Sequence, residues 1–461
     1  MGRYKEKQLH FIGIGGVGMS AIADILLERG YKISGSDIAK SDRVEQLEKK
    51  GAKIAYKQVA DNITDEVDVV VLSSAIHEDN EEYQEAVQQG KEIVHRADML
   101  AYLMEEKKAI CVAGSHGKTT TSSMISLMLW MADVDPTVIV GGEIRQMGSN
   151  ARFGRSEYLV AEADESDGSF VKLHPWISMV TNIEEDHLDH YANLQEIKDT
   201  FAQFIGRTGE DGISILCADC KDALSLKDVA KGKVVTYGFS EEAMVQGRSW
   251  CVEEGLNQAD IYYNGTFLGT LRLQVYGKHN MVNAIGAVAC GLCLGLDFAV
   301  IEKGLAAFIG AKRRFQILST AGNITVVDDY AHHPTEVRAT IEAALDKKPS
   351  RLICVFQPHR YSRTKFLAKE FAACFKGADL VILTDVYAAG EAPLEGVSSQ
   401  IILDYIDQDI QAKLVPMEML NESLLEIVQE GDLVLAMGAG NIWRNTMQLA
   451  EDLEQRYAFQ G

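Results

Sequence analysis

One pattern recurs along the whole chain and limits what it can fold into. A run of apolar and β-branched residues ends in a turn that contains glycine or histidine, and a helical pattern follows. Residues 9–13, 109–113 and 351–357 are three such runs. Strands that alternate with helices build α/β domains, in which helices cover a mostly parallel sheet. The sequence therefore predicts α/β architecture throughout.

The pattern falls into three regions, and the length of 461 residues also favours three domains at roughly 100 to 200 residues each. We expect a Rossmann-like N-terminal domain over residues 1–106, because the charged stretch 105–108 has the composition of a linker. We expect a central domain of the P-loop ATPase type, with a mostly parallel sheet, over residues 107–311. A Rossmann-like C-terminal domain is predicted over residues 312–461.

The charge of the chain restricts its partners. There are 67 acidic and 45 basic residues, which gives a formal net charge of −22. Such a chain repels phosphate backbones and anionic lipid surfaces, so we expect no nucleic-acid or membrane partner. It also has no apolar run near the roughly 20 residues of a membrane span and no apolar signal core at its start. These features predict a cytoplasmic protein and leave its oligomeric state open.

A glycine-rich turn directly follows the first apolar run. Gly13, Gly15 and Gly18 have the spacing of a dinucleotide fingerprint, and Asp37 ends the next predicted strand. In this pattern the glycines let backbone amides approach a diphosphate, and the acidic residue binds a ribose hydroxyl. The pattern favours a diphosphate-bearing ligand over a purely structural turn. It does not distinguish NAD from a nucleotide sugar.

A second loop, at residues 114–121, has the sequence Gly-Ser-His-Gly-Lys-Thr-Thr-Thr between a predicted strand and a predicted helix. It departs from the usual phosphate-binding loop because Val112 stands where the first glycine is expected. The required chemical groups remain. Loop amides can bind phosphates, Lys118 supplies a cation for the β- and γ-phosphates, and the Thr119 hydroxyl can bind a magnesium ion. We therefore predict a nucleotide-triphosphate site here rather than a surface turn.

Acidic and imidazole side chains follow the next two predicted strands. Glu162 ends one of these strands, and His187 lies in the acidic turn after the other. Ligands of parallel sheets collect at the carboxyl ends of strands. If these strands neighbour the strand before the phosphate loop, Glu162 and His187 can complete a divalent-cation site. The alternative is that each cluster is only a solvated acidic turn.

The last two motif groups contain amide, cationic and imidazole side chains. Asn280 and Asn283 begin a predicted apolar helix, where asparagine is often only a cap. His332, Arg360 and Arg363 follow strands of the third region. Arginine side chains would hold a carboxylate-bearing substrate well, and His332 could orient an amine. The alternative is an ordinary His-Pro turn beside solvated arginines.

Taken in order, these motifs resemble the Mur ligase family over nearly the whole chain, from Phe11 to about Trp443. The residues that carry the resemblance are Gly-Ile-Gly-Gly-Val-Gly-Met-Ser (13–20), the loop 114–121, Glu-Ala-Asp-Glu-Ser-Asp (162–167), Asn-Ile-Glu-Glu-Asp-His-Leu-Asp (182–189), His-Asn-Met-Val-Asn (279–283), Asp-Asp-Tyr-Ala-His-His-Pro (328–334) and Phe-Gln-Pro-His-Arg-Tyr-Ser-Arg-Thr (356–364). The resemblance implies an enzyme of peptidoglycan synthesis with three domains. They would bind a UDP-sugar, ATP and an amino acid, in that order along the chain.

The resemblance also implies roles for individual residues. Those expected to be catalytic are Lys118, Glu162 and His187, and the metal ligands are Thr119, Glu162 and His187. ATP is expected to contact Gly114, Ser115, His116, Gly117, Lys118, Thr119, Thr120, His279, Asn280, Asn283, Arg314 and Asp329. The UDP-sugar is expected to contact Gly15, Gly16, Gly18, Asp37, Ser74 and Arg96. The amino acid is expected to contact Tyr330, His332, Arg360 and Arg363.

The implied reaction joins L-alanine to the lactyl carboxylate of UDP-N-acetylmuramate. It would use ATP and Mg²⁺, with Mn²⁺ as a substitute, and would pass through an acyl phosphate. One alternative within the family is a ligase that recycles a tripeptide onto the same UDP-sugar. A nicotinamide-dependent dehydrogenase would explain Gly13 to Asp37 but not the phosphate loop. A UDP-sugar sensor without catalysis would have no need for Glu162 and His187.

Overall fold

The computed structural model describes residues 2–187 and 190–458 of the chain. It divides into two compact units, which are described separately. Unit 1 comprises Met1–Ser249, Ala259–Leu271 and Val282–Phe308. Unit 2 comprises Trp250–Gln258, Arg272–Met281 and Ile309–Gly461. The predicted boundaries at 106/107 and 311/312 stay predictions, because the two units do not correspond to three consecutive domains.

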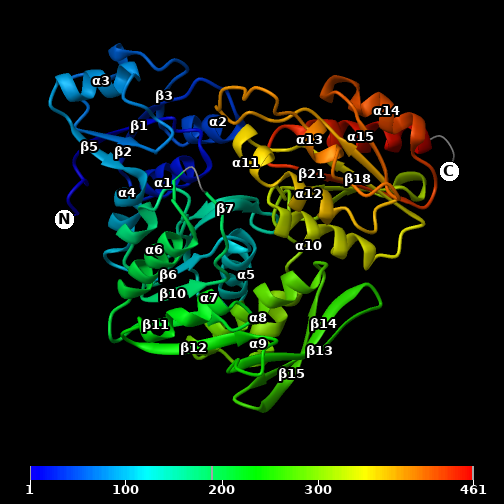
Figure 1. The fold of residues 1–461 in the computed structure, drawn as a ribbon. Helices are drawn as coiled ribbons and strands as arrows, with labels where there is room; N and C mark the ends of the chain where they lie inside the picture. Colours follow the sequence, from blue (N-terminus) through cyan, green and yellow to red (C-terminus); the bar gives the residue numbers. More distant parts are fainter. Residues whose placement is uncertain (1, 188–189, 459–461) are drawn as a thin grey trace. The chain divides into compact units, whose positions relative to one another are not determined.

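The N-terminal part of unit 1 is a five-stranded parallel sheet with the order β3-β2-β1-β4-β5 (Figure 1). Its strands are β1 (Gln8–Ile12), β2 (Lys32–Ser36), β3 (Lys53–Ala55), β4 (Val69–Leu72) and β5 (Glu92–His95). Its helices are α1 (Val17–Glu28), α2 (Asp42–Lys49), η1 (Ala60–Asn62), α3 (Glu81–Gln88) and α4 (Arg96–Met104). The buried strands and the apolar side of α1 form its core. The predicted Rossmann-like fold is confirmed here.

A ten-stranded sheet follows, with the order β15-β14-β13-β12-β11-β10-β6-β9-β7-β8. Its strands are β6 (Lys108–Ala113), β7 (Thr137–Ile144), β8 (Ser149–Arg152), β9 (Tyr158–Glu162), β10 (Ile177–Val180), β11 (Ile213–Cys217), β12 (Lys233–Gly238), β13 (Val245–Glu253), β14 (Leu256–Tyr263) and β15 (Thr266–Leu273). Strand β6 pairs in parallel with both β9 and β10. The expectation that the acidic strands neighbour the loop strand is therefore correct.

Helices pack on this sheet because their sequences carry apolar faces. They are α5 (Lys118–Met131), η2 (Ser169–Lys172), α6 (Leu194–Gly206), α7 (Lys221–Leu224), η3 (Ser225–Asp228), α8 (Lys278–Cys293) and α9 (Phe298–Ala306). Helix α5 is buried from Thr119 to Leu129. Thr119, in the last part of the loop 114–121, therefore belongs to a rigid element. Helix α1 contacts β7 and β8, and this contact joins the two sheets within unit 1.

Unit 2 contains a six-stranded sheet with the order β16-β17-β21-β18-β19-β20. Its strands are β16 (Gln316–Ser319), β17 (Thr325–Asp329), β18 (Arg351–Phe356), β19 (Leu380–Leu383), β20 (Gln411–Leu414) and β21 (Asp432–Met437). Its helices are η4 (Ala321–Asn323), α10 (Pro334–Leu345), α11 (Tyr361–Phe366), α12 (Ala368–Cys374), α13 (Gln400–Leu403), η5 (Met417–Met419), α14 (Leu420–Ile427) and α15 (Ile442–Ala458). All its strands pair in parallel except β16, which is antiparallel to β17.

The predicted apolar run 351–357 forms β18, and β17, β19 and β21 are further parallel strands of the same sheet. Their residues are buried on both faces, which matches their almost continuous apolar sequences. The two edge strands, β16 and β20, were not predicted. Both are short and partly exposed, so their sequences lack the same apolar run. Within residues 2–187 and 190–458, no helix has the length and apolar composition needed to cross a membrane.

Candidate active site

The loop after β6 is built around two glycines. Gly114 and Gly117 have φ angles of 142° and 81°, which side-chain-bearing residues rarely adopt. A Cβ atom on Gly114 would collide with the hydroxyl of Thr181, and one on Gly117 would lie 2.6 Å from the Oδ1 atom of Asn283. The loop can therefore turn tightly into α5 only with glycine at these positions.

The loop is held in shape by Asn182, which follows β10. The His116 N–H donates to Asn182 Oδ1 at 2.8 Å, and the Ser115 N–H donates to the Asn182 carbonyl at 3.1 Å. Lys118 folds back over the loop, where Nζ donates to the carbonyls of Gly114 and Ser115 at 2.6 and 3.2 Å. Asn182 was not among the predicted site residues. Its position next to the acidic turn after β10 was the available signal.

The strand ends on either side of the loop supply the predicted metal-binding groups. Glu162 is the last residue of β9 and pairs in register with Val112 of β6. Its Oε1 atom accepts from the Thr119 hydroxyl at 3.1 Å, and its Oε2 atom accepts from the Gly141 N–H at 2.8 Å. The hydroxyl and carboxylate predicted to bind a metal ion are therefore in direct contact.

His187 has a left-handed backbone with a φ angle of 54°, which is uncommon for a residue with a side chain. The surrounding bonds hold it there. Its N–H donates to Asp186 Oδ1 at 2.7 Å, and its carbonyl accepts from the N–H groups of His190 and Tyr191. This backbone conformation limits the orientation of the imidazole. Residues with such uncommon backbone conformations are frequent at functional sites.

Glu165 links Lys118 to His187. Its side chain is buried, with 1% of the residue exposed, and both of its oxygens lie 2.8 Å from Lys118 Nζ. The Nε2 atom of His187 lies 3.4 Å from Glu165 Oε1. The Tyr191 hydroxyl donates to the Glu165 carbonyl and fixes the turn. Lys118, Glu162 and His187 thus meet at one edge of the sheet, together with a carboxylate that the prediction omitted.

The charges at this edge shift one another's ionisation. Burial by itself lowers the pKa of Lys118, but carboxylates, with Glu165 foremost, raise it above its usual value. Burial raises the pKa of Glu162, against the opposing effect of Lys118. Burial also lowers the pKa of His187, but Glu165 and Asp186 outweigh it and raise that pKa overall. Lys118 is therefore a stable cation beside the loop.

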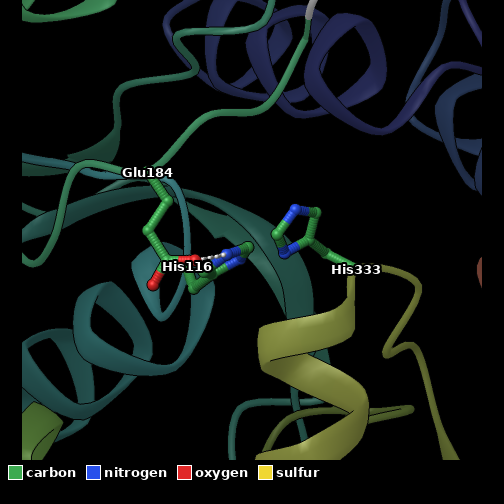
Figure 2. A group of neighbouring side chains, drawn as sticks. All are labelled: His116, Glu184 and His333. Atoms are coloured by element: carbon green, nitrogen blue, oxygen red, sulfur yellow. Dashed lines mark ion pairs between the residues drawn. The ribbon is translucent and has the colours of Figure 1, made fainter. Parts of the chain in front are cut away.

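His116 and Glu184 form a further pair beside the loop. Figure 2 shows the imidazole of His116 directed at Glu184, and the Nε2 and Oε2 atoms lie 3.3 Å apart. The Glu184 N–H also donates to the Ser115 hydroxyl at 2.9 Å. His333, the third residue drawn, belongs to unit 2, where its side chain caps the start of α10. The predicted contact residue His116 is thus part of the same rigid loop.

The remaining predicted contact residues of the loop region are also placed by α5 and α8. Thr120 lies in the first turn of α5 and is buried, as is Asn283 of α8. Asn283 approaches Gly117, so it belongs to the surroundings of the phosphate loop. Asn280 belongs to unit 2, and its amide donates to the Tyr276 carbonyl at 2.7 Å.

The glycine-rich turn after β1 has a different internal partner. The Gly15 N–H donates to the Asp37 carboxylate at 2.8 Å, so Asp37 supports the turn directly. A Cβ atom on Gly15 would lie 2.7 Å from the same carboxylate, whereas one on Gly16 would meet nothing closer than 3.5 Å. Gly18 lies next to Arg96, whose Nη1 atom would be 3.4 Å from an added Cβ. The predicted UDP-sugar residues therefore include two neighbouring pairs, Gly15 with Asp37 and Gly18 with Arg96.

Ser74 and Arg96 contact the acidic turn after β9. The Arg96 guanidinium lies 3.0 Å from Asp164 and 3.6 Å from Asp167, and the Ser74 hydroxyl bonds to Asp167. The Ser74 hydroxyl also lies 3.0 Å from Nε2 of His95. A cavity of about 490 Å³ adjoins them, and its lining includes Ser74, His95, Asp167, Lys172, His190 and Tyr191. The cavity is therefore lined both by residues at the ends of β4 and β5 and by the turn after β9.

In unit 2, Asp329 is the last residue of β17. Its carboxylate accepts from the N–H groups of Phe315 and Ala331 at 2.6 and 2.7 Å. Burial is the largest influence and raises the pKa of Asp329 to about 6, against the opposing effect of Arg314. Burial has the opposite effect on a cationic group, and it lowers the pKa of His279 to about 4. Arg314 lies over the ring of Tyr330, at 5.3 Å from its centroid.

Aromatic and cationic groups follow β17 and β18 as predicted. The ring of His332 lies 5.5 Å from that of Tyr330 and 5.6 Å from that of His359. Arg363 of α11 approaches the His359 ring at 3.4 Å, and Arg360 lies 4.0 Å from Glu391. His332 and Arg363 therefore lie beside His359, which the prediction did not include, and Tyr330 lies beside His332. The place of His359 in the run 356–364, directly before Arg360, was the available signal.

Comparison with known proteins covers all three parts of the chain. Residues 8–108 match the model described as Mur ligase family, catalytic domain, residues 112–291 match the Mur ligase middle domain, and residues 313–440 match the model described as Mur ligase, glutamate ligase domain. The chain belongs to the Mur ligase family. The family resemblance drawn from the ordered motifs is therefore confirmed, as is the three-domain α/β fold.

Among the curated relatives of this ligase is a UDP-N-acetylmuramate–L-alanine ligase from Desulforamulus reducens. It is 48% identical over 460 residues, with 98% of this chain and 99% of the relative covered. A ligase of the same name from Geobacter sulfurreducens is 44% identical over 456 residues, with 98% of each chain covered. Each match extends over essentially the full length of this chain and of the relative.

Two solved structures share the fold of the ligase. A UDP-N-acetylmuramate–alanine ligase from Thermotoga maritima has a TM-score of 0.83 and 29% identity, with 97% of this chain and 99% of that chain covered. A murein peptide ligase from Psychrobacter arcticus has a TM-score of 0.72 and 22% identity, with coverage of 97% and 98%. At 22% identity, the second likeness concerns the fold alone.

Proposed function

We propose that this Mur ligase is a UDP-N-acetylmuramate–L-alanine ligase that uses ATP in peptidoglycan precursor synthesis. The meeting of the phosphate loop with Glu162 and His187 at one sheet edge carries the ligase chemistry. It provides loop amides, a lysine and metal-binding groups in one place. The choice of UDP-sugar and amino acid is supported by whole-chain relatives that bear this name at 44% to 48% identity. The proposal places the protein in the cytoplasm.

ATP is bound by the loop residues Gly114 to Thr120, with Lys118 placed to neutralise phosphate charge. The donor set suits a divalent cation because the Thr119 hydroxyl and the Glu162 carboxylate, already 3.1 Å apart, are oxygen ligands of the kind that Mg²⁺ prefers. His187 adds a nitrogen donor that Mn²⁺ also accepts. Thr119, Glu162 and His187 would hold the cation, which would supply positive charge against the negative charge of the phosphoryl group. For unit 2, the proposal includes His279, Asn280, Arg314 and Asp329 as nucleotide-binding residues.

An amide does not form readily from a carboxylate in water, so the acid must be activated. A lactyl carboxylate oxygen attacks the γ-phosphorus of ATP, the bond to the β,γ-bridging oxygen breaks, and ADP leaves. The L-alanine amine then attacks the resulting acyl phosphate, loses a proton and displaces inorganic phosphate. The protein's share of this chemistry is mainly positioning and electrostatic stabilisation by Lys118 and the loop amides.

The other substrates are assigned to the remaining predicted residues. Gly15, Gly16, Gly18, Asp37, Ser74 and Arg96 bind the UDP-sugar. Tyr330, His332, Arg360 and Arg363 bind the amino acid, whose carboxylate pairs with guanidinium groups. The domain boundaries at 106/107 and 311/312 belong to the same proposal.

The proposal is tested by phosphate release with UDP-N-acetylmuramate, ATP and a panel of amino acids and peptides. We expect release with L-alanine and little with the tripeptide that a recycling ligase would use. Release only with the tripeptide would replace this function by the recycling one. Titration with NADH, followed by fluorescence, addresses the dehydrogenase alternative, and a saturable signal there together with no phosphate release would favour it.

A further inference from the structure

Glu165 lies between two groups of the proposed nucleotide site and has no role in the function proposed so far. Its carboxylate faces Lys118 with both oxygens at 2.8 Å, and Oε1 also faces His187 at 3.4 Å. Lys118 is nearly as enclosed, with 13% of its side chain exposed. The amine that should meet a phosphate is therefore already paired with a buried negative charge.

The surroundings make this pairing important for an incoming triphosphate. Glu162 at the end of β9 and Asp164 in the turn that follows also raise the pKa of Lys118, and Asp186 lies 3.7 Å from His187. A triphosphate without a metal ion would bring several negative charges to this edge. Unscreened like charges at such distances in a partly buried site repel strongly. A divalent cation would offset that repulsion, because carboxylate and phosphate oxygens are both suitable ligands for such a cation.

We propose that Glu165 is the positioning residue that makes this ligase select the metal complex of ATP over free ATP. Its carboxylate is paired with the Lys118 amine, and its negative charge disfavours the binding of a triphosphate without a metal ion. When the metal complex binds, the cation compensates that charge and Lys118 is shared with the phosphates. This inference rests on the proposed function, because it assumes that ATP binds at the loop.

The test is equilibrium binding of ATP to the full-length protein without the other substrates. The dissociation constant is measured by calorimetry in excess Mg²⁺ and in excess EDTA, for the wild type, Glu165→Gln and Glu165→Asp. Glutamine keeps the shape and a hydrogen-bond acceptor but removes the charge, whereas aspartate keeps the charge. Glu241→Gln, in an exposed turn after β12, is the matched control for loss of one negative charge.

We expect Glu165→Gln to bind free ATP on the order of tenfold more tightly than the wild type, because one like charge next to the phosphates is gone. Its affinity in Mg²⁺ should change much less. Glu165→Asp and Glu241→Gln should keep the wild-type difference between the two conditions. Thermal unfolding checks that the variants fold, and Glu165→Ser replaces the glutamine variant if that protein does not.

Two results would overturn the inference. If Glu165→Gln weakens binding only in Mg²⁺, Glu165 is a metal ligand instead. If it changes both constants by the same factor, or neither, the ion pair with Lys118 is merely structural. The proposed function fails separately, if the wild type binds no ATP in Mg²⁺ and releases no phosphate.

Discussion

The hydroxyl of Thr119 and the carboxylate of Glu162 lie 3.1 Å apart, although 42 residues of chain separate them. Thr119 is the second residue of α5, and Glu162 is the last residue of β9. The contact exists because β6 and β9 are parallel neighbours, so the loop after one strand meets the end of the other. A hydroxyl and a carboxylate held this way form a preorganised pair of oxygen donors for a cation.

Replacing Glu162 tests this pair. We expect Glu162→Gln to raise the Mg²⁺ concentration for half-maximal ADP release by about tenfold or more, because an amide oxygen is a weaker ligand than a carboxylate. The measurement is an ADP-release assay at saturating substrates over a range of Mg²⁺ concentrations. An unchanged magnesium curve would exclude Glu162 as a ligand.

The Lys118 side chain donates to two carbonyls of the phosphate loop, so its loss should strongly lower activity. We predict that Lys118→Ala lowers kcat/KM for ATP by about 100-fold or more, because charge on the transferring phosphoryl group loses its fixed counter-charge. Removal also leaves Glu165 buried without its partner, so the free energy of unfolding is measured in parallel. Lys227→Ala, at an exposed position of η3, is the control and should match the wild type. Wild-type ADP release by Lys118→Ala would mean that the site is misplaced.

Two neighbouring glycines provide a matched test of the first loop. In Gly15→Ala the new Cβ would lie 2.7 Å from Asp37 Oδ2 and 2.9 Å from Val44 Cγ2, so the turn must shift. We expect a rise of about tenfold or more in KM for UDP-N-acetylmuramate, with KM for ATP little changed. In Gly16→Ala the new Cβ has only ordinary contacts from 3.5 Å, so the turn keeps its shape and this KM should rise much less than in Gly15→Ala. Equal effects of the two substitutions would argue against this loop as the sugar site.

Asp329 should make the stability of the chain depend on pH. Burial raises its pKa from 3.8 to about 6, so the folded state favours the protonated carboxyl. The stability that this provides is fully present below about pH 4 and is lost as the pH rises through about 6, a loss of about 3 kcal/mol for a shift of this size.

The corresponding measurement is urea unfolding of the wild type and Asp329→Asn between about pH 4 and about pH 7. Asparagine cannot ionise, so the wild type should lose stability relative to the variant as the pH rises. A difference that stays constant, or that grows in favour of the wild type, would show that Asp329 is ionised throughout this range in the folded protein.

Much of the fold could be predicted because it depends on local sequence. Buried parallel strands such as β18 and β21 require continuous apolar runs, and the turn at Gly117 requires glycine. The ordered motifs also fixed the family, since each is a short segment whose chemistry is legible in the residues themselves. The edge strands β16 and β20 were missed because a strand with one exposed side needs no such run.

What the sequence by itself determined was the set of chemical groups, the α/β class and the order of the three regions. Only the tertiary structure decided which groups touch: that Asn182 braces the phosphate loop, that Asp37 binds the Gly15 amide, and that Glu165 pairs with Lys118. These contacts join residues 22 to 66 positions apart. Strand order in the sheets sets such distances, and it depends on how the strands pack together, which no single segment encodes.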